Sequence, residues 1–383
     1  MYKIKVIDNI NEVTKTEWDS VIAKNNLFFT YDYLKAVEKS KIQNFQLKYL
    51  LVYSNEELIG NTCIYLTSYP LDAFLDGIVK KMFVFIRKTF NFRFLYINTL
   101  ECGGAISLGN PFSFNVNKNE QHHLLKLILN QVEEIFINCK ASLIIIRDFF
   151  ESEIEHLLLT FEKFGYIKMK SFPLAVMNIR WNSFDEYVNS LRSHYRHKLK
   201  KNINKMRDGD IKIEVKENLI KDAQLLLQLW LNIYNSTNEI QRELINREYF
   251  ININKYLNKK VKIISAIKEN DIVGFLLVFF DDYTLRFLYS GLDYKYNKKY
   301  SIYFNLLYNL VRIGIEERAK EIDLGISTYI PKIELGSELK PFYLFIKNKY
   351  SFFNRFIPRL EREIDKSIKF KGRRIFNKIY EIY

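Results

Sequence analysis

A run of basic residues between positions 190 and 207 is the part of the sequence best suited to bind an anion. It contains seven Lys or Arg residues and no Asp or Glu. Its apolar residues recur at every fourth position: Leu191, Tyr195, Leu199 and Ile203. This spacing places them on one face of a helix. We therefore expect a helix that is held against a core by its apolar face and that presents its cations to a partner.

Three of these cations form a second row on the expected helix, Arg192, Arg196 and Lys200. Like charges at this spacing destabilise a helix. A row of cations without acidic partners therefore favours a site that an anion occupies part of the time. The alternative is a solvated helix face, as most charge runs are. We predict that the row contacts the phosphates of a bound carrier.

The chain as a whole is also basic. It has 383 residues, of which 48% are hydrophobic, and a formal net charge of +14. This length is enough for two hydrophobic cores, at roughly 150 residues per domain. The excess of positive charge favours a phosphate-rich partner, which would be a nucleic acid, an acyl-carrier cofactor or an anionic membrane surface. We do not expect DNA as a partner.

The sequence offers no recognisable metal site and no membrane span. The three cysteines stand alone, without a CxxC pair, and the five histidines show no HExxH spacing. We therefore expect neither a disulfide scaffold nor a bound metal. No run approaches 18 consecutive apolar residues, and residues 1–10 are typical of a strand rather than of a signal peptide. We expect a cytoplasmic protein and leave open a peripheral contact with the inner face of the membrane.

The hydrophobic patterns divide the chain into two halves of similar order. In the first half they predict a hairpin at 47–53 and 57–66, a strand at 94–106, a helix at 120–138 and a strand at 142–147. In the second half they predict the basic helix at 184–206, a hairpin at 261–268 and 272–281, a strand at 285–289, a long helix at 301–318, and strands at 321–324 and 341–347. The repeated order suggests a structural duplication.

These elements predict an α+β protein of two tandem domains, each a mixed, mostly antiparallel sheet flanked by helices. We place the first domain at 1–168, the second at 169–350, and a basic, aromatic C-terminal helical segment at 351–383. No Gly/Ser-rich linker marks the boundary between the two halves.

Five segments in order resemble the GNAT acyltransferase superfamily, and within it the FemAB-like double-domain branch. That branch includes proteins labelled as peptidoglycan-biosynthesis or BioF-associated acetyltransferases. The matching segments are the helix at 26–34, the basic helix at 191–202, the helical region at 229–250, the strand–loop–helix–strand stretch at 289–325, and Pro331-Lys-Ile-Glu-Leu-Gly336. The resemblance implies two GNAT-like domains and an N-acyltransferase that moves an acyl group from a phosphorylated carrier to an amine.

The resemblance also implies where the acyl donor binds. In a GNAT fold one strand parts from its neighbour, the pantetheine of acyl-CoA enters the V-shaped gap, and the pyrophosphate meets the start of the next helix. Here that loop would be residues 295–301, with Lys298, Lys299 and Ser301 as phosphate contacts and Ser301 as the N-cap. The loop lacks the glycines of the widespread GNAT phosphate loop. Aminoacyl-tRNA, the donor of Fem-type enzymes, is therefore the alternative to acyl-CoA.

Four residues near strand ends could serve acyl transfer to an amine: Asp293, Tyr294, Asp323 and Lys332. The reaction needs a deprotonated amine, a polarised carbonyl and a protonated leaving group. A tyrosine could protonate the leaving group, and Lys332 could steady an oxyanion or a substrate carboxylate. The alternative for each is a structural role, which an acid, a tyrosine or a lysine near a loop has more often.

Two stretches mix aromatic and basic residues in the manner of a helix at a membrane interface, residues 74–90 and 352–383. The alternative for each is a helix that covers a sheet. The sequence therefore leaves three candidate functions. They are an acyl-CoA-dependent N-acyltransferase, a tRNA-dependent aminoacyltransferase of cell-envelope synthesis, and a non-catalytic protein that binds RNA or a membrane.

Overall fold

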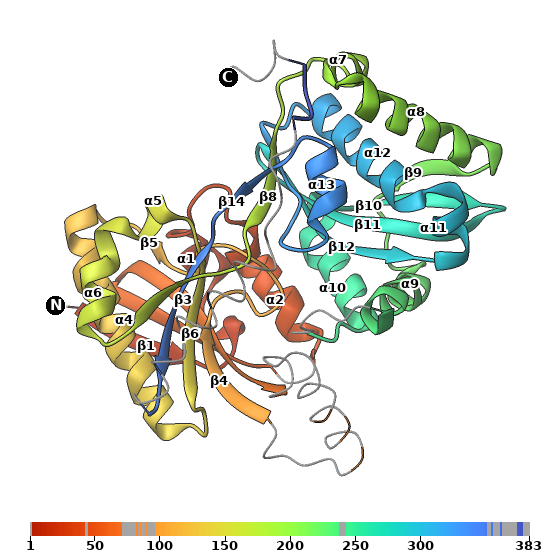
Figure 1. The fold of residues 1–383 in the computed structure, drawn as a ribbon. Helices are drawn as coiled ribbons and strands as arrows, with labels where there is room; N and C mark the ends of the chain where they lie inside the picture. The colour runs from red at the N-terminus through yellow and green to blue at the C-terminus, as the bar shows by residue number, and fades with distance from the viewer. Residues whose placement is uncertain are drawn as a thin grey trace. The chain divides into compact units, whose positions relative to one another are not determined.

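The computed structural model describes residues 2–42, 45–70, 96–236, 243–350 and 374–377, together with five isolated positions. They form two compact units (Figure 1). The first unit takes its described residues from 1–171, 238–244 and 342–367, and the second from 172–237, 245–341 and 368–383. Most of the expected amphipathic stretch at 74–90 and most of the segment at 351–383 lie outside the described residues.

A mixed sheet forms the centre of the first unit, in the order β1-β2-β3-β4-β6-β15-β7, with β5 paired to β3. Its strands are β1 (Tyr2–Ile7), β2 (Gln46–Ser54), β3 (Glu57–Pro70), β4 (Tyr96–Cys102), β5 (Ser113–Phe114), β6 (Leu143–Phe149), β7 (Ile167–Lys170) and β15 (Tyr343–Asn348). The α-helices described in this unit are α1 (Lys15–Asp19), α2 (Tyr31–Lys39), α4 (Lys118–Asn138), α5 (Glu151–Ile154) and α6 (Leu158–Lys163).

The two faces of this sheet are covered by different helices (Figure 1). The 21-residue helix α4 buries Leu124, Ile128 and Val132 on one face, in a core with Leu100 of β4 and Ile144 of β6. On the opposite face Trp18 of α1 packs edge-on against Tyr49, with ring centroids 5.5 Å apart. The apolar residues of α4 recur at helical spacing, which is why this helix was predictable from the sequence.

The second unit is built on another mixed sheet, in the order β14-β8-β13-β12-β11-β10-β9. Its strands are β8 (Leu174–Asn178), β9 (Lys212–Lys216), β10 (Val261–Lys268), β11 (Asp271–Asp281), β12 (Thr284–Leu292), β13 (Glu321–Asp323) and β14 (Glu338–Lys340). Its helices are α7 (Phe184–Ser190), α8 (Ser193–Asp208), α9 (Ala223–Ser236), α10 (Arg247–Leu257), α11 (Tyr294–Tyr300), α12 (Ile302–Glu316) and α13 (Tyr329–Glu334). In Figure 1, α8 and α12 lie on one face of this sheet, and α9 and α10 lie on the other.

The two units share one motif, a helix that connects two parallel neighbouring strands. In the first unit α4 connects β4 and β6, and in the second α12 connects β12 and β13. The other strand pairs described in both sheets are antiparallel. The prediction of an α+β protein with two mixed, mostly antiparallel sheets is therefore confirmed.

One strand lies in a different sheet from the one that the expected domain bounds assign to it. The strand expected at 341–347 forms as β15, but it pairs with β6 and β7 in the first unit. Residues 342–350 therefore belong to the first unit rather than to a continuous second domain. Hydrophobic alternation predicts a strand but does not identify the strands with which it pairs.

Candidate functional site

The strands β12 and β13 part from each other in the second unit. They pair in parallel only from Thr284 to Arg286. Against β11, Phe287 lies opposite Val278 and Tyr289 opposite Leu277, which leaves Leu288 as an extra residue. Such a bulge bends a strand and ends its pairing. The V-shaped gap that the resemblance implies therefore has a physical basis directly after Arg286.

On the other side of the gap, the chain after β13 stays with β8. The N–H of Leu324 donates to the carbonyl oxygen of Ala175 at 2.8 Å, and the N–H of Ala175 donates to that of Gly325 at 3.1 Å. Gly325 has a φ of +76°, a conformation that glycine adopts at little cost. Past the bulge, the edge of β12 that faced β13 has no strand partner among the described residues.

Three charged side chains meet at the base of this gap. Arg286 joins two carboxylates: its Nη1 lies 3.1 Å from Oδ2 of Asp323 and its Nε lies 3.1 Å from Oδ2 of Asp281. Both aspartates are buried, and the second oxygen of Asp323 accepts a hydrogen bond from the N–H of Gly325 at 2.9 Å. The pKa of Asp323 is raised above its ordinary value, because the effect of burial exceeds the opposing effects of the Arg286 charge, the Gly325 hydrogen bond and the Lys332 charge.

Lys332 lies at the same place, on the short helix α13. Its side chain is only 3% exposed, and its Nζ is 5.6 Å from the ring centroid of Phe287. A Cβ added to Gly325 would lie 3.7 Å from that Nζ and 3.6 Å from the carbonyl oxygen of Phe287. The ammonium group and the backbone of β12 therefore border the same small space. We had expected Lys332 at a strand end, but it lies in a helix.

A buried cation at the point where strands part can stabilise negative charge. In a region of low dielectric constant, an ammonium group interacts more strongly with a developing oxyanion than it would in water. Asp323 and Arg286 hold the surrounding charges in fixed positions. The arrangement suits a reaction in which a carbonyl oxygen becomes negatively charged.

The other two expected catalytic residues lie at the far end of β12. Asp293 caps α11, where its Oδ1 accepts a hydrogen bond from the N–H of Lys295 at 2.8 Å. Tyr294 is exposed, and its hydroxyl is 2.6 Å from that of Ser236. Arg286 and Asp293 are seven residues apart along a strand, which is roughly 20 Å. The four residues thus form two separate pairs, and only the pair of Asp323 and Lys332 lies at the base of the gap.

The basic helix is shorter than predicted, because the chain breaks at Leu191 and Arg192. We expected one helix over 184–206, but α7 ends at Ser190 and α8 starts at Ser193. The N–H of Arg192 donates to the carbonyl oxygen of Ile375 at 2.9 Å, and Leu191 forms a β-bridge with Phe376. This long-range pairing holds two residues in an extended conformation that a helical pattern cannot reveal.

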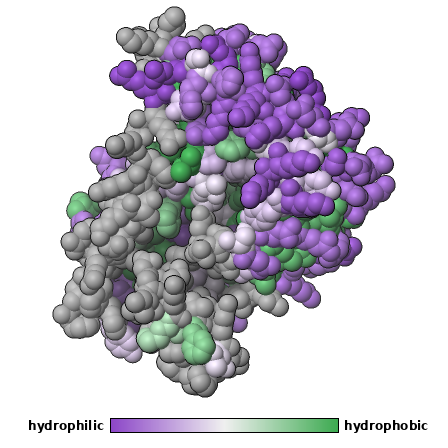
Figure 2. Space-filling view, turned by 45° about the vertical axis from the view of Figure 1, so that its right-hand side comes forward, coloured by the Kyte–Doolittle hydropathy of each residue, from purple (hydrophilic) through white to green (hydrophobic). Residues whose placement is uncertain are grey.

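The apolar stripe of α8 faces the core as predicted, and the cations lie outside it. Leu199 is buried, and Tyr195 and Ile203 pack against the same core. Arg192 and Lys200 are exposed, while Arg196 is half-buried and donates from Nη1 to the carbonyl oxygen of Asn189 at 3.3 Å. Hydrophilic residues cover the upper part of the second unit in Figure 2.

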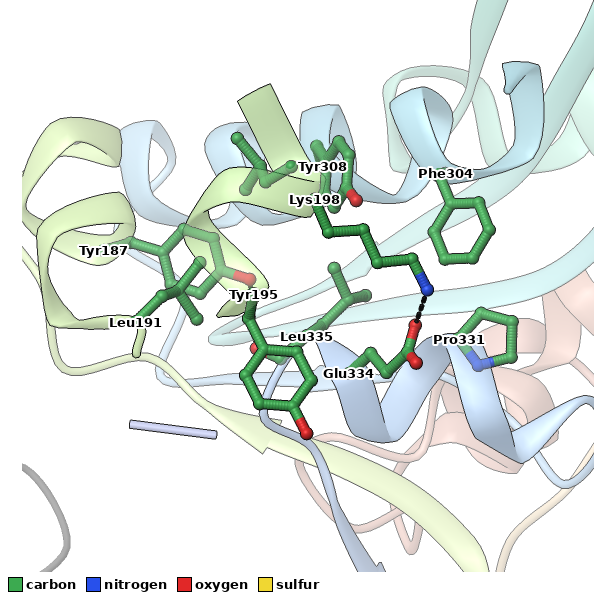
Figure 3. Close-up of a pocket in the computed structure, with 10 residues that line it drawn as sticks. Tyr187, Leu191, Tyr195, Lys198, Phe304, Tyr308, Pro331, Glu334 and Leu335 are labelled. Atoms are coloured by element: carbon green, nitrogen blue, oxygen red, sulfur yellow. Dashed lines mark hydrogen bonds and ion pairs between the residues drawn. The ribbon is translucent and has the colours of Figure 1, made fainter. Parts of the chain in front are cut away.

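One cation of α8 does have an acidic partner, from another helix. Lys198 Nζ lies 2.5 Å from Glu334 Oε2 of α13, across a small hollow between α8, α12 and α13 (Figure 3). The hollow holds about 10 Å³, room for about one water molecule. It is too small for a substrate. Its ion pair ties the basic helix to α13, the helix that carries Lys332.

The expected phosphate loop at 295–301 is a helix. Residues 294–300 form α11, and Ser301 follows in the left-handed conformation with a φ of +54°. The side chain of Ser301 makes no capping bond. Asn297 replaces it, because its Oδ1 accepts a hydrogen bond from the N–H of Tyr303 at 2.9 Å. Ser301 therefore occupies the N-cap position of α12 as predicted, but its hydroxyl does not cap the helix.

The lysines of α11 extend the cationic surface of α8. Lys298 and Lys299 are exposed, and α11 contacts α8 near the end of that helix, where Tyr300 lies against Gly209. The 16 residues of α8 span roughly 24 Å. Arg192 and Lys299 therefore lie toward opposite ends of an elongated surface and not around one pyrophosphate.

Sequence reasoning missed Asp281 and Arg286. Neither belongs to a recognisable motif, and only the register of the bulged strand brings them beside Asp323. Among the described residues, no group of three or more His, Cys, Asp or Glu side chains is arranged to hold a metal ion. In the same part of the chain no helix combines the length and hydrophobicity that crossing a bilayer requires.

Solved structures resemble this fold over most of its length at low sequence identity. FemX is 11% identical, with a TM-score of 0.54, over 88% of this chain and 96% of its own. L-PGS from Bacillus licheniformis is also 11% identical, with a TM-score of 0.50, over 85% of this chain and 90% of its own. At this level of identity the likeness shows the fold alone.

Sequence comparison gives a more specific result. A Mycobacterium tuberculosis protein named "Putative 8-amino-7-oxononanoate synthase 2" is 21% identical over 323 residues, or 83% of this chain. The chain spans 42% of the length of that relative. Residues 108–329, more than half of the chain, match the FemAB-like family, described as peptidoglycan biosynthesis/recognition. The chain therefore belongs to the FemAB-like family.

Proposed function

We propose that the protein is an acyl- or aminoacyltransferase that acylates an amine in the gap between β12 and β13. The observation that carries this proposal is the position of Lys332, which lies buried where the bulge at Leu288 ends the pairing of the two strands. Membership of the FemAB-like family supports the same class of reaction.

The reaction forms a bond between the amine nitrogen and the acyl carbon of the donor. As the amine attacks, the carbonyl oxygen becomes an oxyanion, and the ammonium group of Lys332 stabilises it. The bond from the acyl carbon to the carrier then breaks, and the carrier oxygen or sulfur leaves with the proton that the amine loses. Asp323 acts as the counter-ion that keeps Lys332 charged.

The cationic surface favours a donor with many phosphates. The cations of α8 and α11 line roughly 24 Å of helix. A nucleic-acid strand of that length carries about seven phosphates, at 3.4 Å each. Lys298 and Lys299 lie on a helix that lacks the glycines of a pyrophosphate loop. We therefore infer that aminoacyl-tRNA is the donor to test first.

Acyl-CoA is the second candidate donor, and the geometry of β12 favours it. Beyond the bulge, the edge of this strand that faced β13 is left without a strand partner among the described residues. The pantetheine arm of acyl-CoA could add its amide groups there as an extra strand does. For the acceptor we infer an amine on a peptidoglycan precursor, because the family description names peptidoglycan biosynthesis or recognition.

A transfer assay with both donors tests the proposal. Purified protein is incubated with radiolabelled aminoacyl-tRNA or acetyl-CoA and a peptidoglycan precursor that carries a free amine. We expect label in the precursor, and loss of transfer on RNase treatment would identify tRNA as the donor. The Lys332→Ala variant should be inactive, while Lys340→Ala, a lysine paired with Glu321 in the same unit, should be active. Absence of transfer from both donors would overturn the proposal.

A further inference from the structure

Four charged side chains from four elements converge below the gap. They come from β11, β12, β13 and α13: Asp281, Arg286, Asp323 and Lys332. Asp281, Asp323 and Lys332 are 6%, 4% and 3% exposed. Burying one uncompensated charge is costly. The cluster contains two cations and two carboxylates, and buried charges this close together influence one another.

The ion pairs of Arg286 show how the charges of the cluster are connected. Arg286 donates a hydrogen bond from Nη1 to Oδ2 of Asp323 and another from Nε to Oδ2 of Asp281, each at 3.1 Å. The charge of Lys332 also acts on Asp323, since its Nζ would lie 3.7 Å from a Cβ on Gly325, the residue whose N–H donates to Asp323. Asp281 neutralises part of the charge of Arg286. The carboxylate of Asp323 is thereby available as a counter-ion for Lys332.

We propose that Arg286 and Asp281 are positioning residues that act through Asp323 to set the charge state of Lys332. The inference rests on the proposed function for its purpose, because a lysine that stabilises an oxyanion must carry its proton. Neither residue needs to touch the substrate. The inference concerns the protonation state of Lys332, which can be measured on the protein without any substrate.

Two carboxylates of the described residues near α13 have cationic partners of their own. Glu334, on α13 itself, is bound to Lys198 of α8 at 2.5 Å. Glu321, at the start of β13, is bound to Lys340 of β14 at 2.8 Å. Neither pair includes Asp281 or Arg286.

The inference predicts opposite effects from two substitutions. Asp281→Asn removes a negative charge, so the pKa of Lys332 should fall and its neutral amine should become more abundant. Arg286→Met removes a positive charge, so the pKa of Lys332 should rise. The double variant restores the balance of charges and should resemble the unaltered protein. A shift of half a pKa unit changes the fraction of neutral amine about threefold.

Competitive labelling measures this fraction residue by residue. Each variant is treated with trace acetic anhydride across pH 7 to 10, and mass spectrometry gives the acetylation of Lys332 relative to Lys340. At pH 8 we expect an increase of about threefold for Asp281→Asn and a decrease of about threefold for Arg286→Met. The titration curve should move in the same directions, which a merely structural role would not produce.

Two outcomes would overturn the inference. Increased labelling in both single variants would mean that the fold has loosened around Lys332, and unchanged labelling would mean that the cluster does not control it. If Arg286→Met does not fold, Asp281→Asn still tests the inference alone, and Arg286→Lys, which keeps the charge, should label as the unaltered protein does. The labelling uses no substrate, so a failure of the proposed transfer activity is scored separately.

Discussion

Arg286 and Asp323 form an ion pair between the last residues at which β12 and β13 are aligned, with Nη1 and Oδ2 3.1 Å apart. An ion pair at this position fixes two strands to each other at the point where they begin to part. It stabilises the end of the parallel pairing and leaves the gap beyond it open. The gap therefore has a rigid base, which suits a site that must hold reacting groups in place.

The first unit has a comparable pair with the charges exchanged. Glu101 on β4 and Arg147 on β6 lie 2.9 Å apart, near the end of the parallel pairing of those strands. Arg147 also donates to the hydroxyl of Tyr65 at 2.7 Å and to the carbonyl oxygen of Gly104. No register shift interrupts the pairing of β4 with β3. In this unit the buried side chains of Glu101, Arg147 and Tyr65 lie bonded to one another near the end of the parallel pairing, which supports placing the reaction in the second unit.

Lys332→Ala should lower the transfer rate by at least about a hundredfold, since loss of one oxyanion donor costs about that much in other enzymes. The effect should fall on kcat rather than on the KM for either substrate. Lys332→Arg keeps the charge and should retain part of the activity. Steady-state kinetics with Lys340→Ala as the control checks this prediction. Equal loss of activity in Lys340→Ala would contradict it.

The sequence predicted the elements around the site better than the site itself. Helix α4 and strands β10 and β11 followed from periodicity, because each buries a regular set of apolar residues. The break at Leu191 was not predictable, since residues 375 and 376 cause it through long-range pairing. For the same reason Asp281 and Arg286 were missed. Their role depends on a bulge and on strand register, which local patterns do not encode.

His156 should make the first unit less stable in mild acid. Burial lowers the pKa of this histidine, the charges of Lys118 and His122 lower it further, and Glu155 opposes them. The unfolded chain therefore binds a proton more readily than the folded chain, and stability is lost as the pH falls through 6.5. His156→Gln should show a smaller loss of stability between pH 7.5 and 5.5 in urea unfolding. An equal loss in the variant would contradict the prediction.

Arg147→Met should destabilise the first unit strongly. The side chain of Arg147 is buried with Glu101 and Asp148, so its removal leaves carboxylates without their cation. Breaking a buried pair in this way costs about 3–5 kcal/mol. Lys15→Met is the matched control, because Lys15 is exposed and bridges Asp19 and Asp32 at the surface. Exposed pairs contribute about 1 kcal/mol or less.

Denaturant unfolding of both variants, followed by far-ultraviolet circular dichroism, gives the two free energies. A difference between them of less than about 1 kcal/mol would mean that the Arg147 network contributes no more than a surface pair does. A large difference would show that the buried network of Arg147 stabilises the first unit more than a surface pair does.

The exposed cations of α8 should control donor binding. Arg192→Glu combined with Lys200→Glu reverses two charges on a surface that does not support the core. If phosphates of the donor lie along α8, the affinity for tRNA should fall about tenfold or more at low salt. The dependence of log K on log salt should become shallower by about two, because two phosphate contacts are lost.

Lys126→Glu combined with Lys140→Glu changes the net charge of the chain by the same amount in the first unit, where both lysines are exposed. Filter binding over a salt series compares the two double variants. An equal loss of tRNA affinity in both double variants would mean that net charge alone attracts the nucleic acid. The cations of α8 would then not form a specific binding surface. A loss confined to the α8 variant would place the carrier on that helix, because long-range attraction depends on total charge whereas contacts depend on position.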